Sequence, residues 1–260
     1  MRKPLTNLAR PSGALAMVAV DQREALRGMF APHQSTPVPD SQLTQFKVDV
    51  ARELSPFASA LLVDQEFGID AIINQKVLNS GCGLIAAADL LVGPAGGAAT
   101  DTAIDPDVDP IRMRDIGSVG LKFLVLWRND ESPDVRAKLV EDFNKLCEIS
   151  GLPSIIEIIV KPPTDSSRSF NREEELIIAA REAAAWKPDL YKAEVPFHGE
   201  GDLNLVTKNA DRISEAIGSP WVVLSNGVKQ PFFNDAVKAC AMGGASGFLA
   251  GRAVWADIVS

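Results

Sequence analysis

The sequence predicts an α/β fold, a single (β/α)8 TIM barrel, from three observations. The length of 260 residues suits one barrel catalytic domain spanning residues 1–260. The composition, with 46% hydrophobic and 23% charged residues, is typical of a soluble globular protein with a sizeable core. Eight short apolar segments alternate with helical patterns, and many are apolar on both faces, which favours a closed barrel over an open doubly wound sheet.

The eight strands are expected in order along the chain. Each is a compact apolar run, and the first two are followed directly by an acid, Asp21 and Asp64. The expected strands are Gly13–Val20, Ser59–Val63, Gly83–Ala87, Leu121–Leu126, Ser154–Val160, the run Asp189–Pro196, Trp221–Leu224 and Gly247–Ala250.

Helices are expected between the strands, where apolar residues recur at helical spacing and capping residues mark the ends. The first should begin with Asp40 as its cap and bury Leu43, Phe46, Val50 and Leu54. The later helices are expected at Ile69–Leu78, after Asp109 and Pro110, from Ser132 and Pro133 to Gly151, from Asn171 to about Trp186, at Val206–Ile217 before Gly218, and from Pro231.

Two segments do not fit a regular alternation. Val92–Asp109 is rich in Gly, Ala and Asp, has little helical or strand signal, and is expected to be a lid or binding loop, or disordered. After the eighth strand only Ala253–Ser260 remain, which are too few for a full closing helix. That helix is therefore expected to be short or missing, through truncation or disorder.

Charge and cysteine content restrict the partners. A formal charge of −8, from 26 basic and 34 acidic residues, argues against nucleic acid or an anionic membrane. We expect neither a signal peptide nor a transmembrane helix, because no apolar run is long enough for either. Cys82, Cys147 and Cys240 are scattered, so we expect reduced core residues in a cytoplasmic protein. His33 and His198 are interpreted as loop histidines, and neither a metal nor a cofactor is expected.

Polar side chains at the strand ends form the candidate site, because barrels place their functional residues at the carboxyl ends of their strands. These residues are Asp21, Gln22, Asp64, Lys122, Glu157, Lys192, Glu194, Ser225 and Arg252.

Lys192 and Glu157 are the most informative of these residues, and each has two interpretations. Lys192 alternates with Leu190 and Glu194 on one side of its strand, and it either pairs with Glu194 and water or acts as an amine nucleophile. Glu157 lies among isoleucines, where a carboxylate requires a polar cavity or a cation. It forms a salt bridge with Lys122 or Lys192, or acts as a general acid/base, and these roles are compatible.

Two small-residue turns are candidates for phosphate binding. Ser225, Asn226 and Gly227 follow the seventh strand, and Gly251 and Arg252 follow the eighth. Barrels frequently bind phosphate after these two strands, where glycine lets the backbone approach the anion. The alternative is ordinary turn chemistry with a surface arginine.

Met17–Arg23, Asp189–Pro196 and Gly247–Trp255 carry a family resemblance that extends almost end to end. They are similar to the class I aldolases that include tagatose-1,6-bisphosphate aldolase. Ala19–Met29, Leu124–Asp130 and the strand of Lys192 more closely resemble the sulfofructosephosphate aldolase branch of that family.

The resemblance implies a role for each matched residue. Lys192 matches the Schiff-base lysine and Glu157 the proton-transfer carboxylate, whereas Asn226 departs from the small residue expected at its position. The other matches are Asp21, Gln22 and Lys122 around the sugar hydroxyls, and Ser225, Gly251 and Arg252 at the phosphate.

The implied reaction is cleavage of 6-deoxy-6-sulfofructose 1-phosphate to dihydroxyacetone phosphate and sulfolactaldehyde, in sulfoquinovose breakdown. Arg252 is expected at the carbon 1 phosphate, and the sulfonate is expected in a site with fewer cations near the third-strand loop or Arg128. The residues leave open two alternatives, a tagatose or fructose 1,6-bisphosphate aldolase and a non-catalytic sugar-phosphate-binding regulator. The expected partners are the small-molecule substrate and further copies of the chain, in a dimer or tetramer.

Overall fold

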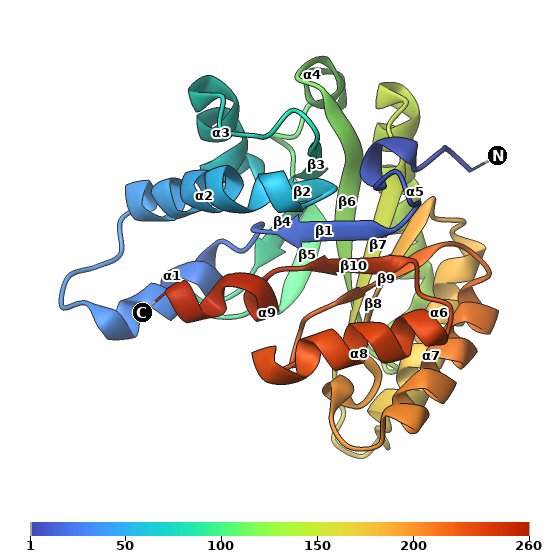
Figure 1. Ribbon diagram of the computed structural model, residues 1–260. Coiled ribbons are helices and arrows are strands. Elements are labelled where there is room, and N and C mark those ends of the chain that lie inside the picture. The colour runs from blue at the N-terminus through green and yellow to red at the C-terminus, as the bar shows by residue number, and fades with distance from the viewer. Residues whose placement is uncertain (1, 260) are drawn as a thin grey trace.

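Eight parallel strands form a closed ring at the centre of the computed structural model, which describes residues 2–259 (Figure 1). All eight expected strands are present, so the predicted (β/α)8 barrel is confirmed. In ring order they are β1 (Leu15–Ala19), β10 (Gly247–Ala250), β9 (Trp221–Leu224), β8 (Leu190–Glu194), β7 (Ser154–Val160), β6 (Ser118–Trp127), β3 (Gly83–Ala87) and β2 (Ala60–Val63).

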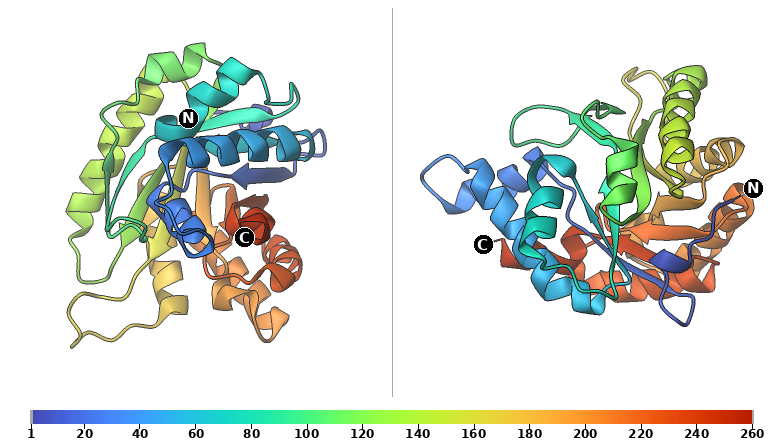
Figure 2. Two further views of the ribbon diagram at one scale, coloured as in Figure 1. Left: turned by 90° about the vertical axis from the view of Figure 1, so that its left-hand side faces the viewer. Right: turned by 90° about the horizontal axis from the view of Figure 1, so that it is seen from above.

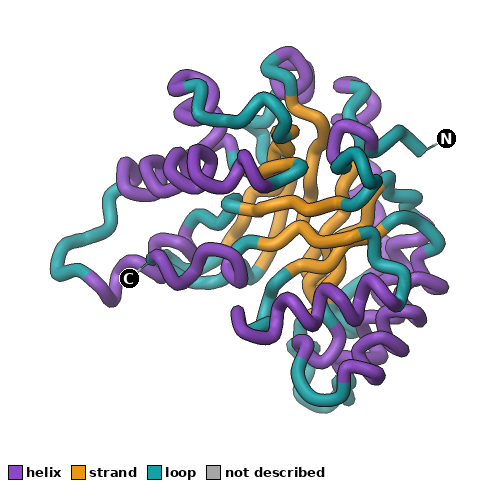
Figure 3. The backbone as a smooth tube through the Cα atoms, in the orientation of Figure 1, coloured by secondary structure: helices purple, strands orange, loops and turns teal. Residues whose placement is uncertain are grey.

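Helices surround the ring of strands, which occupies the middle of the molecule (Figures 2 and 3). At least one helix follows each strand of the barrel, as the apolar periodicity predicts, whereas the helix at Glu24–Phe30 was not predicted. The helices are α1 (Glu24–Phe30), α2 (Asp40–Leu54), α3 (Asp70–Gln75), α4 (Pro110–Asp115), α5 (Pro133–Ser150), α6 (Arg172–Ala185), α7 (Leu203–Ile217), α8 (Gln230–Met242) and α9 (Arg252–Trp255).

The end signals of most helices act as expected. The Asp109 carboxylate accepts the N–H groups of Ile111 and Arg112 at 2.9 and 3.2 Å, which caps α4. Asn171 caps α6 in the same way. Gly151 and Gly218 end α5 and α7 in the left-handed conformation that glycine adopts without steric cost.

Two expected helix ends are wrong. Asp40 is the first helical residue and Pro39 holds the cap position, because the Asp40 carboxylate pairs with Arg27 Nη2 at 2.7 Å. The helix expected at Ile69–Leu78 ends at Gln75, because Lys76 has a left-handed φ of 54°. A π-helical turn, Gln65–Ile69, precedes it and receives its cap from Asp64.

The segment after β3 forms a hairpin where the sequence shows little strand signal. β4 (Asp89–Val92) pairs antiparallel with β5 (Asp101–Ile104), so the expectation of an irregular or disordered segment is wrong for residues 101–104. The tip of the hairpin lies on α1, where the Gly96 N–H donates to Glu24 Oε2 at 2.9 Å. A Cβ at Gly28 would lie 2.0 Å from Gly96 O, so this approach requires glycine.

The barrel interior is apolar toward the amino ends of the strands and charged at their carboxyl ends. Leu8, at the end of the 3₁₀ turn Thr6–Leu8, is fully buried and packs in the interior cluster with Met17, Leu62 and Leu249. One layer higher, β8 replaces Leu190 by Lys192, whose side chain lines a cavity. Because every second residue of β8 points to the same side, one face of this strand runs from the apolar core at Leu190 to the cavity at Lys192.

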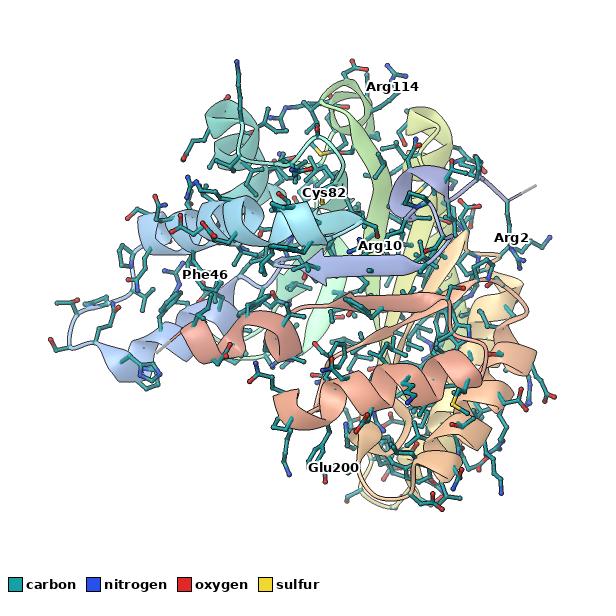
Figure 4. The ribbon with its side chains drawn as sticks, in the orientation of Figure 1. Arg2, Arg10, Phe46, Cys82, Arg114 and Glu200 are labelled. Carbon is teal, nitrogen blue, oxygen red and sulfur yellow. The ribbon has the colours of Figure 1, made fainter. Side chains whose placement is uncertain are left out.

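The helix after β10 is α9, which has only four residues, in agreement with the expectation that the closing helix is short or missing. Trp255 attaches it to β1, since its Nε1–H donates to Ala19 O at 2.8 Å. The same ring makes an edge-to-face contact with Phe46 of α2, which is labelled in Figure 4, and the two ring centroids are 5.3 Å apart. Short as it is, α9 covers the β1 end of the barrel.

Candidate active site

A cavity opens at the carboxyl ends of the strands and contains about 790 Å³ of space, part of it open to solvent. Eight of the eleven residues that the sequence predicts for the site line this cavity. They are Asp21, Gln22, Lys122, Glu157, Lys192, Ser225, Gly251 and Arg252. The structure thus brings together residues from both ends of the sequence.

Lys192 and Glu157 lie side by side on neighbouring strands at the centre of the cavity. They are register partners across β8 and β7, and Lys192 Nζ lies 2.9 Å from Glu157 Oε2. Lys122 Nζ lies 2.9 Å from the same oxygen. Neither contact has the angles of a hydrogen bond, so this oxygen has two ionic partners and no hydrogen-bond donor among residues 2–259.

Lys122 is surrounded by carboxylates. Besides Glu157, its Nζ contacts Asp21 Oδ2 at 2.7 Å and Asp89 Oδ2 at 2.9 Å. Burial alone would lower the pKa of Lys122, but attraction to these three carboxylates outweighs it and raises the pKa well above the ordinary value of 10.5. Lys122 is therefore a permanent ammonium ion.

Asp21 shows the complementary balance. Burial favours its neutral form, yet attraction to Lys122, Lys192 and Arg23 is larger in sum and lowers the pKa of Asp21 below its ordinary value of 3.8. Asp21 is therefore ionised at neutral pH. The mouth of the barrel contains a compact network of opposite charges rather than isolated groups.

Asp89 belongs to this network, and the sequence reasoning missed it. It is fully buried and accepts hydrogen bonds from Lys122 at 2.9 Å, from the Leu124 N–H at 3.0 Å and from Arg23 at 3.3 Å. It follows an apolar strand closely, as Asp21 and Asp64 do, and that rule would have found it.

Three predicted residues lie outside the cavity lining. The Asp64 carboxylate accepts from the buried Lys47 ammonium and from the Phe67 N–H at 2.8 Å, which places it behind the site. Gly227 is exposed with a φ of 75°, and a Cβ there would lie 2.4 Å from His198 Nδ1. Glu194 is the third of these residues.

Glu194 lies at the rim between neighbouring elements. Its Oε2 accepts the Val160 N–H at 2.8 Å, and its Oε1 accepts from Asn226 Nδ2 at 3.0 Å and Arg172 Nη2 at 3.3 Å. Every one of these contacts is to the protein itself. Glu194 therefore supports the residues around the cavity from behind.

The two turns predicted to bind phosphate meet at one side of the cavity. The Gly251 N–H donates to Ser225 Oγ at 3.3 Å, and Arg252 Nη2 donates to Asn226 Oδ1 at 2.8 Å. A Cβ at Gly251 would lie 2.7 Å from Ala19 O, so only glycine fits there. The exposed guanidinium of Arg252 is free to bind an anion with its remaining donors.

Lys161 is a second cation at the cavity rim, besides Arg252, and sequence reasoning missed it. It follows β7 directly, is half-buried, and its ammonium has no partner among the described residues 2–259. Arg128, the residue named for this role, does not line the cavity and pairs with Glu131 at 2.7 Å. A lysine immediately after a predicted strand was the available signal.

The β4–β5 hairpin forms one wall of the cavity through Leu91, Ala98 and Ala99. Its apolar side chains face the same space as Lys161 and Arg252. The hairpin therefore lies where a binding loop would lie, and its role in binding stays a prediction.

Two other kinds of feature, a metal-ligand cluster and a membrane-spanning helix, are absent from residues 2–259. No cluster of three or more His, Cys, Asp or Glu side chains has an arrangement suited to a metal ion. No helix within that range is long and apolar enough to cross a membrane. Cys82, Cys147 and Cys240 are all buried and free, as expected.

A closed parallel barrel with ionisable side chains at the carboxyl ends of its strands is the architecture of the (β/α)8-barrel enzymes, whose active sites lie at those ends. The sequence profile of the DeoC/LacD family aldolases matches residues 15–257. The chain belongs to this family and is an aldolase, a carbon–carbon lyase.

The relatives agree with this assignment. Tagatose 1,6-diphosphate aldolase 2 of Streptococcus pyogenes serotype M3 is 30% identical over 99% of this chain and 85% of its own. Tagatose 1,6-diphosphate aldolase 1 of Enterococcus faecalis is 30% identical over 98% and 84%.

Solved structures share the fold at lower identity. The fructose-bisphosphate aldolase from Slackia heliotrinireducens superposes with a TM-score of 0.67 at 19% identity, over 94% of this chain and 76% of that one. An archaeal fructose-1,6-bisphosphate aldolase, solved with its catalytic Lys covalently bound to the carbinolamine intermediate, gives 0.64 at 16%, over 97% and 91%.

Proposed function

We propose that this aldolase is a class I, Schiff-base enzyme that cleaves 6-deoxy-6-sulfofructose 1-phosphate into dihydroxyacetone phosphate and sulfolactaldehyde. One observation carries the chemistry. Lys122 is held by three carboxylates, whereas Lys192 contacts Glu157 alone among residues 2–259. Of the two buried lysines that line the cavity, Lys192 is the one less tightly held by carboxylates, which suits it to act as the nucleophile.

The reaction begins when Glu157 takes a proton from the Lys192 ammonium and the free amine Nζ attacks the carbon 2 ketone. Glu157, 2.9 Å away, passes a proton to the carbinolamine oxygen, so that water leaves and an iminium forms. Glu157 then takes the proton of the carbon 4 hydroxyl, the bond between carbons 3 and 4 breaks, and the iminium accepts the electron pair. Sulfolactaldehyde leaves, and protonation of the enamine at carbon 3 followed by hydrolysis releases dihydroxyacetone phosphate.

The surrounding polar groups bind the sugar hydroxyls in this proposal. The Lys122 ammonium and the Asp21 carboxylate line the cavity beside Glu157. Gln22 Oε1 is buried and has no hydrogen-bond partner among residues 2–259. A substrate hydroxyl would satisfy this acceptor, since a buried polar atom without a partner costs free energy.

The two cations at the rim suit the two ends of the substrate. Arg252 follows β10 and Lys161 follows β7, three strands apart in the ring of eight. Arg252, beside Ser225 and Gly251, would bind the carbon 1 phosphate. Lys161 would bind the carbon 6 anion, next to the apolar wall of the hairpin.

The single cation at the carbon 6 end favours a sulfonate. A sulfonate has one negative charge and no ionisable proton, whereas a phosphate approaches two negative charges. Among residues 2–259, Lys161 is the unpaired cation that lines this part of the cavity, whereas Arg128 lies outside the lining and pairs with Glu131. One ammonium and an apolar wall match a monoanion better than a dianion.

The deciding experiment is a turnover assay that compares 6-deoxy-6-sulfofructose 1-phosphate with tagatose and fructose 1,6-bisphosphate. We expect the sulfonated ketose to have the highest kcat/KM. A higher kcat/KM for either bisphosphate would make this protein a bisphosphate aldolase with the same chemistry. Arg252→Ala should weaken dihydroxyacetone phosphate binding by about 1.5 to 3 kcal/mol, the scale of hydrogen bonds to charged groups.

The proposal extends to conditions and assembly. Activity should survive EDTA, because the iminium takes the role that a metal has as electron sink in other aldolases. Loss of activity that added zinc restores would contradict the Schiff-base mechanism. Buried free thiols fit a cytoplasmic enzyme, and a dimer or tetramer stays a prediction for solution scattering to test.

A further inference from the structure

Asn226 connects a buried carboxylate to the arginine of the cavity rim. Its Nδ2 donates to Glu194 Oε1 at 3.0 Å, and its Oδ1 accepts from Arg252 Nη2 at 2.8 Å. A carboxylate only accepts hydrogen bonds and a guanidinium only donates them, so one orientation of the amide satisfies both neighbours. The side chain of Asn226 is therefore fixed at both ends.

Glu194, the anchor of this contact, is itself immobilised. It is 1% exposed, and besides Asn226 it binds the Val160 N–H at 2.8 Å and Arg172 Nη2 at 3.3 Å. These partners come from different elements around the rim. A carboxylate held in this way gives Asn226 a rigid support.

Arg252 has the opposite character. Its side chain is exposed, and its guanidinium donates to Asn226 Oδ1 and to no other acceptor among residues 2–259. A free surface arginine samples many rotamers, and ordering it on an anion costs conformational entropy. A neighbour that orders the arginine beforehand reduces that cost.

We propose that Asn226 is a positioning residue that holds the Arg252 guanidinium at the cavity and thereby sets the affinity for the phosphorylated end of the ketose. The inference rests on the proposed role of Arg252 at the carbon 1 phosphate. A neutral amide suits this task, because it orders the arginine without neutralising its charge. An aspartate there would face Glu194 and compete with the phosphate for Arg252.

The first measurement is the calorimetric Kd for dihydroxyacetone phosphate, made in Lys192→Met protein so that no imine forms. Asn226→Ala should weaken binding about tenfold and Asn226→Asp by more, because the aspartate also neutralises Arg252. Asn204→Ala on α7 is the matched control, since the Asn204 side chain makes no hydrogen bond within residues 2–259 and its loss should change nothing.

The second measurement separates positioning from general damage to the site. Borohydride trapping of dihydroxyacetone, which lacks the phosphate, should keep its half-saturating concentration in Asn226→Ala. In an Arg252→Ala background, Asn226→Ala should add no further loss of dihydroxyacetone phosphate affinity. Both results would show that Asn226 acts through Arg252 on the phosphate.

Three outcomes would overturn the inference: unchanged dihydroxyacetone phosphate affinity in Asn226→Ala, an equal loss for dihydroxyacetone, or a loss that persists without Arg252. Failure of the proposed function is a different result. If borohydride traps nothing on Lys192, the Schiff-base proposal falls, while the calorimetric comparison of Asn226→Ala still decides the inference. Absence of any binding to the parent protein overturns both.

Discussion

The floor and the mouth of the barrel use the same strands for opposite purposes. At the floor, Leu8, Met17 and Leu190 fill the interior with apolar side chains. At the mouth, Lys122 and Lys192 occupy equally buried positions, 2% and 3% exposed, where three carboxylates contact Lys122 and one contacts Lys192. Buried charges are costly unless they are paired, so the protein gives up packing stability at the end where we propose the active site.

Replacing Lys192, the proposed nucleophile, should give the largest effect at the mouth. Lys192→Met should abolish turnover and leave the fold intact, because a side chain of similar volume replaces the amine. Mass spectrometry after borohydride treatment with dihydroxyacetone phosphate should place the adduct on Lys192. An adduct on Lys122 would exchange the roles of the two lysines.

Glu157→Gln should give the next largest effect. It keeps the shape of the side chain but removes proton transfer next to Lys192, so cleavage should slow by roughly 10² to 10⁴. Single-turnover kinetics would measure this loss. A rate within twofold of the parent would leave Glu157 a structural partner of the two lysines.

Lys122→Met tests the mouth against the floor in terms of stability. It leaves Asp21, Asp89 and Glu157 buried with one fewer cation, and we expect a loss of about 3 to 5 kcal/mol in the free energy of unfolding together with loss of turnover. Leu8→Ala at the floor should cost about 2 to 5 kcal/mol, with kcat unchanged. Urea unfolding and steady-state assays would compare them, and a Leu8→Ala enzyme with a lower kcat would break the division between the two regions.

Acid sensitivity should show the smallest effect. Because the pKa of Asp21 is lowered on folding, its ionised form stabilises the protein above the ordinary value of 3.8, and that stability is lost as pH falls below it. Asp21→Asn should cost about 1 to 3 kcal/mol at pH 7.

The measurement is urea unfolding of Asp21→Asn and the parent from neutral pH to below 3.8. The gap between the two proteins should narrow as the parent carboxylate takes up its proton. A gap of constant size across this range would show that Asp21 contributes through packing and not through charge.

The wall of the cavity shows where sequence reasoning failed. The hairpin strand Asp101–Ile104 has no strong strand signal, and it forms because it pairs with Asp89–Val92 and rests on α1. Lys161 and Asp89 were missed although each follows a predicted strand closely. The strand signal of residues 101–104 is too short to identify a strand, whereas position just after a predicted strand identifies Lys161 and Asp89.

The sequence by itself determined the eight strands, their order, and the presence of Lys192 and Glu157 on strands that could meet. Apolar runs and two-residue alternation are local properties, so they survive without knowledge of the fold. Only the tertiary structure decided that Lys122 would contact three carboxylates and that Glu194 would support Asn226 behind the cavity. Partners at the rim come from strands and turns far apart in the sequence, and ring closure alone sets which of them meet.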